Sequence, residues 1–308
     1  MAAIPLFILE AAFVLAWSSG FVGAKLGVPH ADPFTLLFWR FLLVAVLLFT
    51  LLWWRDGPWI RSKSLLGHVV VTGLLAQGVY LACVFQAIDL GVSAGLTALV
   101  AATQPLVTAA LARPVLGERV GRRQWLGLVI GMAGVFLVVG HGALGDGPQA
   151  GPFAYSLPVF AVLGLTAATL YQRRLGGDAP ILPSLAIQAA ATAALFGCLG
   201  ALSGGLAVDP SAGFLLAVGW LTLFSTFGAY GLLWLLLRRC EVTRVASLVY
   251  LTPPVTMIWA LLMFGEMLSA VDVVGLGIAA LGVGLVQGRS ANGACPEPSP
   301  TAGTRPAR

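Results

Sequence analysis

The sequence predicts an all-α integral membrane protein, with ten transmembrane helices in two inverted-topology five-helix repeats around a central cavity. Composition, the spacing of apolar runs and an internal repeat lead to this prediction. Of the 308 residues, 59% are hydrophobic and only 9% are charged, and the mean hydropathy is +0.95. Soluble globular chains carry about 25% charged residues. Because so few charges cannot cover a water-soluble particle of this size, the solvent of this chain is lipid.

The apolar runs set the number of crossings. A spanning helix needs about 20 apolar residues and a connection adds about 4 to 8, so the chain up to residue 288 divides into about ten crossings. We expect helices, because an open strand edge has no hydrogen-bond partner in lipid and the alternation of a barrel is absent. The predicted spans are residues 3–24, 34–54, 65–88, 93–112, 125–139, 152–172, 182–202, 214–237, 245–263 and 271–287.

Basic residues predict the orientation of the spans. Of the 17 lysines and arginines, all but Lys25 and Arg40 fall in even-numbered connections or in the carboxyl-terminal segment. Cytoplasmic loops carry the excess of basic residues. The sequence therefore predicts a multi-pass protein of the inner cell membrane with both termini in the cytoplasm. Trp53, Trp54 and Trp59 beside the first basic cluster are typical of an interfacial aromatic belt.

Other function classes are excluded on specific grounds. The bases are scattered between apolar runs, so no nucleic-acid partner is expected. The four cysteines show no metal-ligand spacing, and neither a zinc-protease motif nor a P-loop occurs, so no metal or cofactor is predicted. Residues 91–95 read GVSAG, but the nucleophile elbow needs a strand-to-helix turn. Because Ser93 is expected only to cap a helix, the protein is not predicted to be an enzyme.

The two halves of the chain resemble each other at an offset of about 150 residues. Tyr80 aligns with Tyr230, and the Leu-Gly-Glu sequence at 116–118 aligns with Phe-Gly-Glu at 264–266. Glycines of the following helices also align. Order preserved over a helix pair and its Gly-Glu loop indicates an internal repeat. Glu118 and Glu266 in these loops are predicted to cap neighbouring helix starts.

The repeat predicts the domain organisation. Residues 1–146 form the first five-helix repeat, residues 147–288 the second, and residues 289–308, rich in Pro, Gly and Ser, a disordered cytoplasmic tail. Five crossings are an odd number, so the second repeat enters from the opposite face. Inverted repeats around a midplane site are typical of alternating-access transporters.

Several motifs resemble a known family. They are WSSGFVGAKLG at 17–27, FWRF at 38–41, and QP at 104–105 ahead of LGE and a G-x-x-x-G-x-x-G-V run at 127–135. They resemble the EamA-type members of the drug/metabolite transporter superfamily over nearly the whole chain to about residue 288. The resemblance implies ten helices in two inverted halves, cytoplasmic termini and export of small metabolites or drugs. Within that superfamily the chain is most similar to the YddG-like branch, exporters of aromatic amino acids and methyl viologen.

Helix breakers mark the first candidate site positions. Pro105, Pro253 and Pro254 occupy repeat-equivalent positions inside the fourth and ninth spans. Discontinuous helices expose backbone dipoles at membrane depth, so we expect both helices to kink beside the cavity. The alternative is ordinary tolerance of proline in membrane helices.

Aromatic and polar side chains within the spans are the candidate substrate-binding residues. An aromatic or cationic cargo would stack on aromatic rings. Tyr80, with Gln77 one turn before it, and Tyr230, with Trp234 one turn later, are expected to form two symmetry-related gates. The alternative for any one of these residues is helix packing. The full candidate set is Trp17, Gln77, Tyr80, Tyr230, Trp234, Tyr250, Trp259 and Arg40.

Charges inside the membrane are functional candidates by default. Arg40 and Lys25 are each expected to attract a substrate carboxylate, or Arg40 to form a structural lock with backbone carbonyls or Asp89. Glu10 lies well within the first span. It is interpreted as a proton-coupling group, as a counter-charge for a cationic substrate, or as a satisfied structural carboxylate.

Together these features predict a secondary transporter that exports small amphipathic metabolites or drugs, chiefly aromatic amino acids and planar cations, by alternating access. Its partners are that small-molecule substrate, the lipid bilayer and, if Glu10 couples transport, protons. A carrier of nucleotide-sugars or phosphorylated compounds would need more basic cavity residues than Lys25 and Arg40. A membrane enzyme or a scaffold would need a catalytic constellation or a soluble face, and neither is visible.

Overall fold

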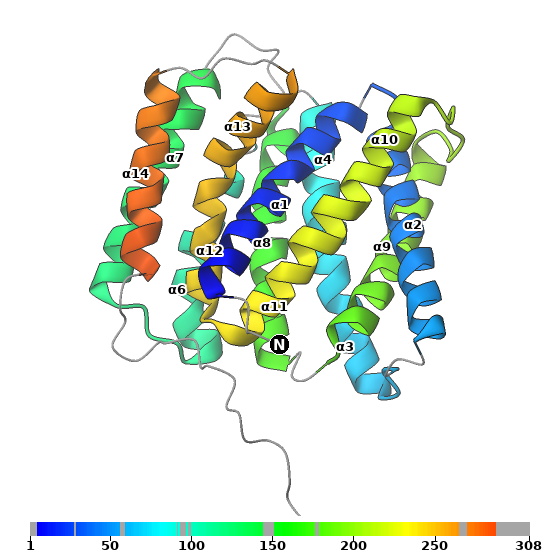
Figure 1. The fold of residues 1–308 in the computed structure, drawn as a ribbon, viewed down its shortest axis with the longest axis horizontal. Coiled ribbons are helices and arrows are strands. Elements are labelled where there is room, and N and C mark those ends of the chain that lie inside the picture. Colours follow the sequence, from blue (N-terminus) through cyan, green and yellow to red (C-terminus); the bar gives the residue numbers. More distant parts are fainter. Residues whose placement is uncertain are drawn as a thin grey trace, which may run out of the picture.

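The computed structural model describes residues 5–27, 29–55, 59–90, 92, 97, 100–143, 151–175, 179–264 and 270–287. The elements of this part of the chain are all helical (Figure 1). In the first half they are α1 (Leu6–Gly27), α2 (Pro33–Trp54), α3 (Lys63–Gly73), the π-helical segment η1 (Leu74–Val79), α4 (Tyr80–Asp89), α6 (Gln104–Leu116) and α7 (Arg122–Ala143). In the second half they are α8 (Pro152–Leu175), α9 (Ile181–Ser203), α10 (Ala212–Trp220), the π-helical segment η2 (Leu221–Tyr230), α11 (Gly231–Arg239), α12 (Val242–Ser247), the 3₁₀ segment η3 (Leu248–Leu251), α13 (Thr252–Phe264) and α14 (Ala270–Gln287).

Several of these helices are long and apolar enough to cross a bilayer. The prediction of an all-α membrane protein is therefore confirmed. The helices α6, α7, α12–α13 and α14 overlap the four other predicted spans, and ten crossings stay a prediction. The six stretches that meet the length and hydropathy of a span are Leu6–Ala24, Pro33–Trp54, Lys63–Ala87, Pro152–Leu175, Ile181–Ser203 and Ala212–Arg239.

Polar residues determine where individual helices begin. The Asp32 carboxylate accepts hydrogen bonds from the Phe34 and Thr35 amides, 3.0 and 3.3 Å away, and Pro33 opens α2. The Ser62 and Ser211 hydroxyls accept from the amides three residues later at the starts of α3 and α10. Such caps satisfy amides that have no partner inside the helix.

The third and eighth predicted spans share an unusual interruption. In each, an α-helix passes into a π-helical segment and returns to an α-helix, as α3–η1–α4 and as α10–η2–α11. π-Helical turns are rare and occur frequently at functional sites. The hydrophobic pattern did not predict them.

The two outer helix pairs of the molecule are antiparallel. Along α7, Gly127 lies against Gly282 of α14, and Gly134 lies against Gly275, so one number rises as the other falls. A Cβ at Gly127 would lie 2.6 Å from the Gly282 carbonyl oxygen, and one at Gly134 would lie 2.7 Å from that of Gly275. Only small residues allow backbones this close.

The pair α2 and α9 shows the same relation through larger side chains. Phe41 stacks on Phe196 with ring centroids 6.0 Å apart, whereas Thr35, earlier in α2, faces Gly200, later in α9. The residue numbers of the contacting pairs again rise along one helix as they fall along the other. These two helices are therefore also antiparallel.

The helices α1 and α8 lie in the middle of the molecule. In Figure 1, α7 and α14 lie side by side at one end, α2 and α9 at the other, and α1 crosses between them. Helix α1 packs against η2 and α13, and α8 packs against η1, α4 and α6. Side chains from both halves therefore meet around α1 and α8.

Candidate functional site

Trp17 on α1 is the centre of an aromatic cluster that we define as Phe13, Trp17, Tyr80 and Tyr230. Its ring centroid lies 5.4 Å from Phe13, 6.4 Å from Tyr80 and 5.3 Å from Tyr230. Each distance lies in the range in which aromatic pairs attract. All four residues are buried. The cluster joins α1 to both interrupted helices.

The two tyrosines that we predicted as symmetry-related gates lie in one cluster. Tyr80 begins α4 directly after η1, and Tyr230 ends η2, but both rings contact the same residue, Trp17. The Tyr230 hydroxyl also donates to the Ala76 carbonyl of η1, 2.9 Å away. The repeat-equivalent tyrosines therefore share one cluster, and their role as gates stays a prediction.

Gln77 and Trp234 meet at a residue that the sequence did not single out. The Gln188 side-chain oxygen accepts from Gln77 Nε2 at 3.1 Å and from Trp234 Nε1 at 3.0 Å. All three side chains are buried. The available signal was the presence of a glutamine in the otherwise apolar and small-residue run of α9. This glutamine bridge links η1, α9 and α11.

Arg40 is buried among hydroxyl groups. Its side chain is 2% exposed, its Nε donates to Thr226 Oγ1 at 3.0 Å, and its Nη2 donates to Ser225 Oγ at 2.9 Å. The guanidinium lies 4.9 Å from the Phe41 ring centroid. Asp89, the predicted structural partner, instead accepts from Gln86 at 3.4 Å. The lock formed by Arg40 is therefore with η2, while the side chain of Lys25 lies outside the described residues.

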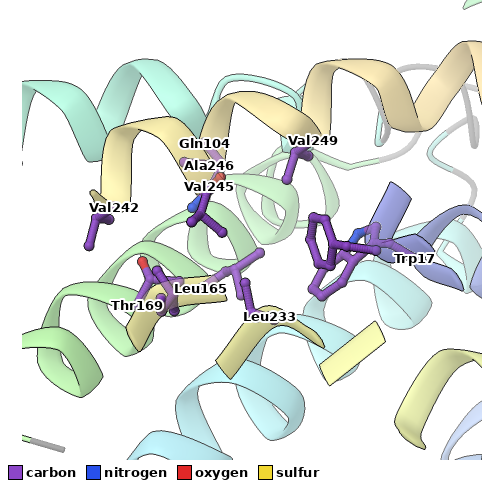
Figure 2. A pocket seen from close by; sticks show the side chains of 11 residues that line it. Trp17, Gln104, Leu165, Thr169, Leu233, Val242, Val245, Ala246 and Val249 are labelled. Carbon is purple, nitrogen blue, oxygen red and sulfur yellow. The ribbon is translucent and has the colours of Figure 1, made fainter. Parts of the chain in front are cut away.

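A narrow cavity opens next to Trp17 (Figure 2). It has room for roughly one water molecule. Its walls come from both halves of the chain and are mostly apolar. The lining residues are Phe13, Trp17, Gln104, Leu165, Thr169, Leu233, Leu237, Val242, Val245, Ala246 and Val249. Most were not predicted as site residues, because an apolar cavity wall and a helix-packing face have the same sequence pattern.

Glu10 forms an ion pair with Arg244 of α12. The Arg244 Nε atom lies 2.9 Å from Glu10 Oε1, and the two side chains are 21% and 8% exposed. Glu10 lies one turn before Phe13 and on the same face of α1 as Trp17. The ion pair therefore lies just beyond the cavity and connects the two halves.

A second polar contact connects the halves at the same end of the cavity. The Glu118 carboxylate accepts from the amide of Val242, the first residue of α12, at 3.2 Å, and lies 3.5 Å from Arg173. Arg173 also donates to the Leu237 carbonyl at 2.7 Å. Burial raises the pKa of the Glu118 carboxyl, and the charge of Arg173 opposes this. The capping role predicted for Glu118 is confirmed, whereas Glu266 and Ser93 lie outside the described residues.

Two predicted aromatic residues lie away from the cluster. The Trp259 indole donates to the Leu15 carbonyl at 3.3 Å and packs against Trp220, 5.6 Å away. Tyr250 is fully buried against α7, where a Cβ at Gly131 would contact its ring. Neither is among the residues that line the cavity.

The predicted helix breakers lie at helix starts. Pro105 is in the first turn of α6, after a turn at Ala102 and Thr103. Pro253 follows η3 at the start of α13, and the side chain of Pro254 lies outside the described residues. Neither proline is among the cavity-lining residues, although Gln104 is.

Comparison with known proteins identifies the family. The model of the EamA-like transporter family matches twice, at residues 4–140 and 152–287. An inner membrane transporter of Escherichia coli, YedA, is 27% identical over 92% of this chain and 90% of its own length. A probable amino-acid metabolite efflux pump of Salmonella typhimurium is 28% identical over 85% of this chain and 88% of its own length.

A solved crystal structure has the same fold, with a TM-score of 0.77 at 20% identity, covering 91% of this chain and 95% of that chain. The two family matches cover nearly all of the chain, and the similar proteins carry the names of membrane transporters and efflux pumps. The chain therefore belongs to the EamA-like transporter family of membrane proteins.

Proposed function

We propose that this protein exports small amphipathic metabolites or drugs, aromatic amino acids and planar cations such as methyl viologen among them, by alternating access. The observation that carries the proposal is the cavity beside Trp17, to which both halves of the chain contribute walls. Transporter sites of this kind lie at the interface between repeats.

An inverted arrangement of the two halves is part of this proposal. The second helices of the two halves, α2 and α9, pack antiparallel, as do the fifth helices, α7 and α14. The contacts of α1 with η2 and α13 have counterparts in the contacts of α8 with η1 and α6. Exchange of the two halves thus relates one set of contacts to the other. These relations support a pseudo-two-fold axis in the membrane plane.

The contacts between the halves suggest how the cavity changes access. The ion pair of Glu10 with Arg244 and the hydrogen bond from the Val242 amide to the Glu118 carboxylate hold the halves together at one end of the cavity. The bond from Tyr230 to the Ala76 carbonyl lies across the aromatic cluster. Rocking of one half against the other would break the Glu10–Arg244 ion pair and the hydrogen bond between Val242 and Glu118. It would widen the narrow cavity and open it to the face where α1 begins.

The lining favours an aromatic or apolar cargo. Among the described residues, those that line the cavity carry no charge, and Phe13 and Trp17 provide ring faces. A phosphorylated or nucleotide-sugar cargo would lack basic partners there. The name of the Salmonella relative, an amino-acid metabolite efflux pump, supports amino-acid cargo. We propose the YddG-like exporters as the functional analogue and an inner-membrane location with cytoplasmic termini.

Transport by the purified protein tests this function. Vesicles that contain the protein and labelled phenylalanine should release the label several-fold faster than protein-free vesicles. Tyr230→Ala should slow the release, because it removes a ring from the Trp17 cluster and the hydroxyl bonded to Ala76. Trp53→Ala is the control, because that indole is 75% exposed. Equal release with and without protein would reject the aromatic amino-acid cargo.

A further inference from the structure

Gln104 is a buried polar side chain in the wall of the cavity. It begins α6, it is 2% exposed, and it lines the cavity together with Trp17 (Figure 2). Its Nε2 donates to Thr108 Oγ1 one turn later, at 3.0 Å. Its Oε1 is buried and has no hydrogen-bond partner within the described part of the chain.

An unpaired acceptor in this position lowers the stability of the protein when no cargo is bound. A buried carbonyl-type oxygen without a donor loses its hydration and gains nothing in return. Thr169, the other polar side chain of the wall, does not donate a hydrogen bond to the Gln104 oxygen, because its hydroxyl donates to the Thr166 carbonyl at 2.9 Å. The Gln104 oxygen is therefore available to a group that enters the cavity.

The chemistry of the wall selects the kind of group that enters. A carboxylate or phosphate would bring its acceptor oxygens against another acceptor, with no basic residue in the lining. A protonated amine brings N–H donors to the Gln104 oxygen, and a ring face such as that of Trp17 attracts the positive charge. The apolar side chains of Leu165, Leu233 and Val249 leave the rest of the lining suited to a hydrocarbon or aromatic body.

We propose that Gln104 is the specificity-determining residue for the amine of the cargo, accepting a hydrogen bond through Oε1. The inference rests on the proposed transport function and narrows the cargo class to small aromatic or apolar amines, amino acids among them through their ammonium group. Because the cavity is narrow, the amine meets Gln104 once the halves have moved apart.

Competition experiments test the role of Gln104. Export of labelled phenylalanine is measured with unlabelled phenethylamine or 3-phenylpropionate as competitor, two compounds that share the ring but differ in the charged group. Phenethylamine should compete with the wild type and 3-phenylpropionate should not. In Gln104→Leu, competition by phenethylamine should weaken about tenfold or more, as expected for loss of a hydrogen bond to a charged group. In Gln104→Glu, competition by phenethylamine should be retained, because the ionised carboxylate still offers an acceptor oxygen.

Thr108→Val is the matched control. It removes the partner of Gln104 Nε2 but leaves Oε1 in place, so competition should stay within about threefold of the wild type. Thermal unfolding of the purified protein gives a readout without transport: phenethylamine should raise the unfolding midpoint of the wild type and not that of Gln104→Leu.

The outcomes separate this inference from the transport function. Phenylalanine export with equal competition in the wild type and Gln104→Leu would overturn the inference alone. Loss of competition by phenethylamine in Gln104→Glu would contradict the acceptor role of Gln104. Preference of the wild type for 3-phenylpropionate would assign a donor role to the residue. Either result would also overturn the inference. If the wild type exports no phenylalanine, that part of the proposed function fails, and absence of a thermal shift by phenethylamine would then overturn the inference as well.

Discussion

Replacing Trp17 with alanine should slow phenylalanine export by an order of magnitude or more and destabilise the protein. The substitution removes the ring that contacts Phe13, Tyr80 and Tyr230 and a face of the cavity wall. Truncation of a buried aromatic residue costs about 3–5 kcal/mol of folding free energy. Initial export rates and the thermal unfolding midpoint of purified protein measure the two effects.

Trp17→Phe separates the role of the ring in transport from its role in folding. Phenylalanine keeps an aromatic face, so export should recover substantially while some loss of stability remains. Trp39→Ala is the control, because it removes an indole away from the cavity, together with the hydrogen bond of that indole to the Leu206 carbonyl at 3.1 Å. Equal export by Trp17→Ala and Trp39→Ala would exclude Trp17 from the transport pathway.

Removing one partner of the Glu10–Arg244 ion pair should destabilise the protein unequally. Arg244→Gln leaves the carboxylate of Glu10 buried, whereas Glu10→Gln leaves an arginine that is 21% exposed and still partly hydrated. Breaking a buried pair costs about 3–5 kcal/mol, because one charge stays uncompensated. We expect Arg244→Gln to lower the thermal unfolding midpoint more than Glu10→Gln.

The double variant Glu10→Gln with Arg244→Gln should recover most of the lost stability, since no unpaired charge remains. Arg123→Gln, which removes an exposed charge at the start of α7, is the control and should leave the midpoint unchanged. If Glu10 couples transport to protons, acceleration of export by a pH gradient should disappear in Glu10→Gln. If the double variant is no more stable than Arg244→Gln, the unpaired carboxylate of Glu10 is not the cause of the lost stability.

The sequence predicted those parts of the fold that follow from hydropathy. Six of the predicted spans correspond to helices of membrane length, because lipid requires a continuous apolar run with internally paired backbone. The internal repeat is supported by the two matches of one family model. Hydropathy did not predict η1 and η2, because a π-helical turn changes backbone pairing without changing the apolar pattern.

The candidate site was predicted only in part. Trp17, Tyr80 and Tyr230 were expected because aromatic residues at membrane depth stand out in the sequence, and they form one cluster. The pairing of Glu10 with Arg244 was not predicted. These residues are far apart in the chain, and Arg244 was assigned to a basic cytoplasmic connection by the same rule that gave the orientation.

The cavity wall was the least predictable part. Gln104 was noted only within a family motif, and Gln188 was overlooked, because a single amide in an apolar helix gives no periodic signal. Which of many apolar side chains face a cavity depends on how two helices from different halves cross. That relation is not encoded in any local pattern.

Labelling of introduced cysteines tests the inverted arrangement most directly. In a variant without the four native cysteines, Arg119→Cys marks the exposed connection after α6, and Ala270→Cys marks the exposed start of α14. A maleimide that cannot cross the membrane is added to intact cells. The account predicts that Ala270→Cys reacts at once and that Arg119→Cys reacts only after the membrane is opened. Reaction of both cysteines from the same face would contradict two inverted halves and the alternating-access transport that depends on them.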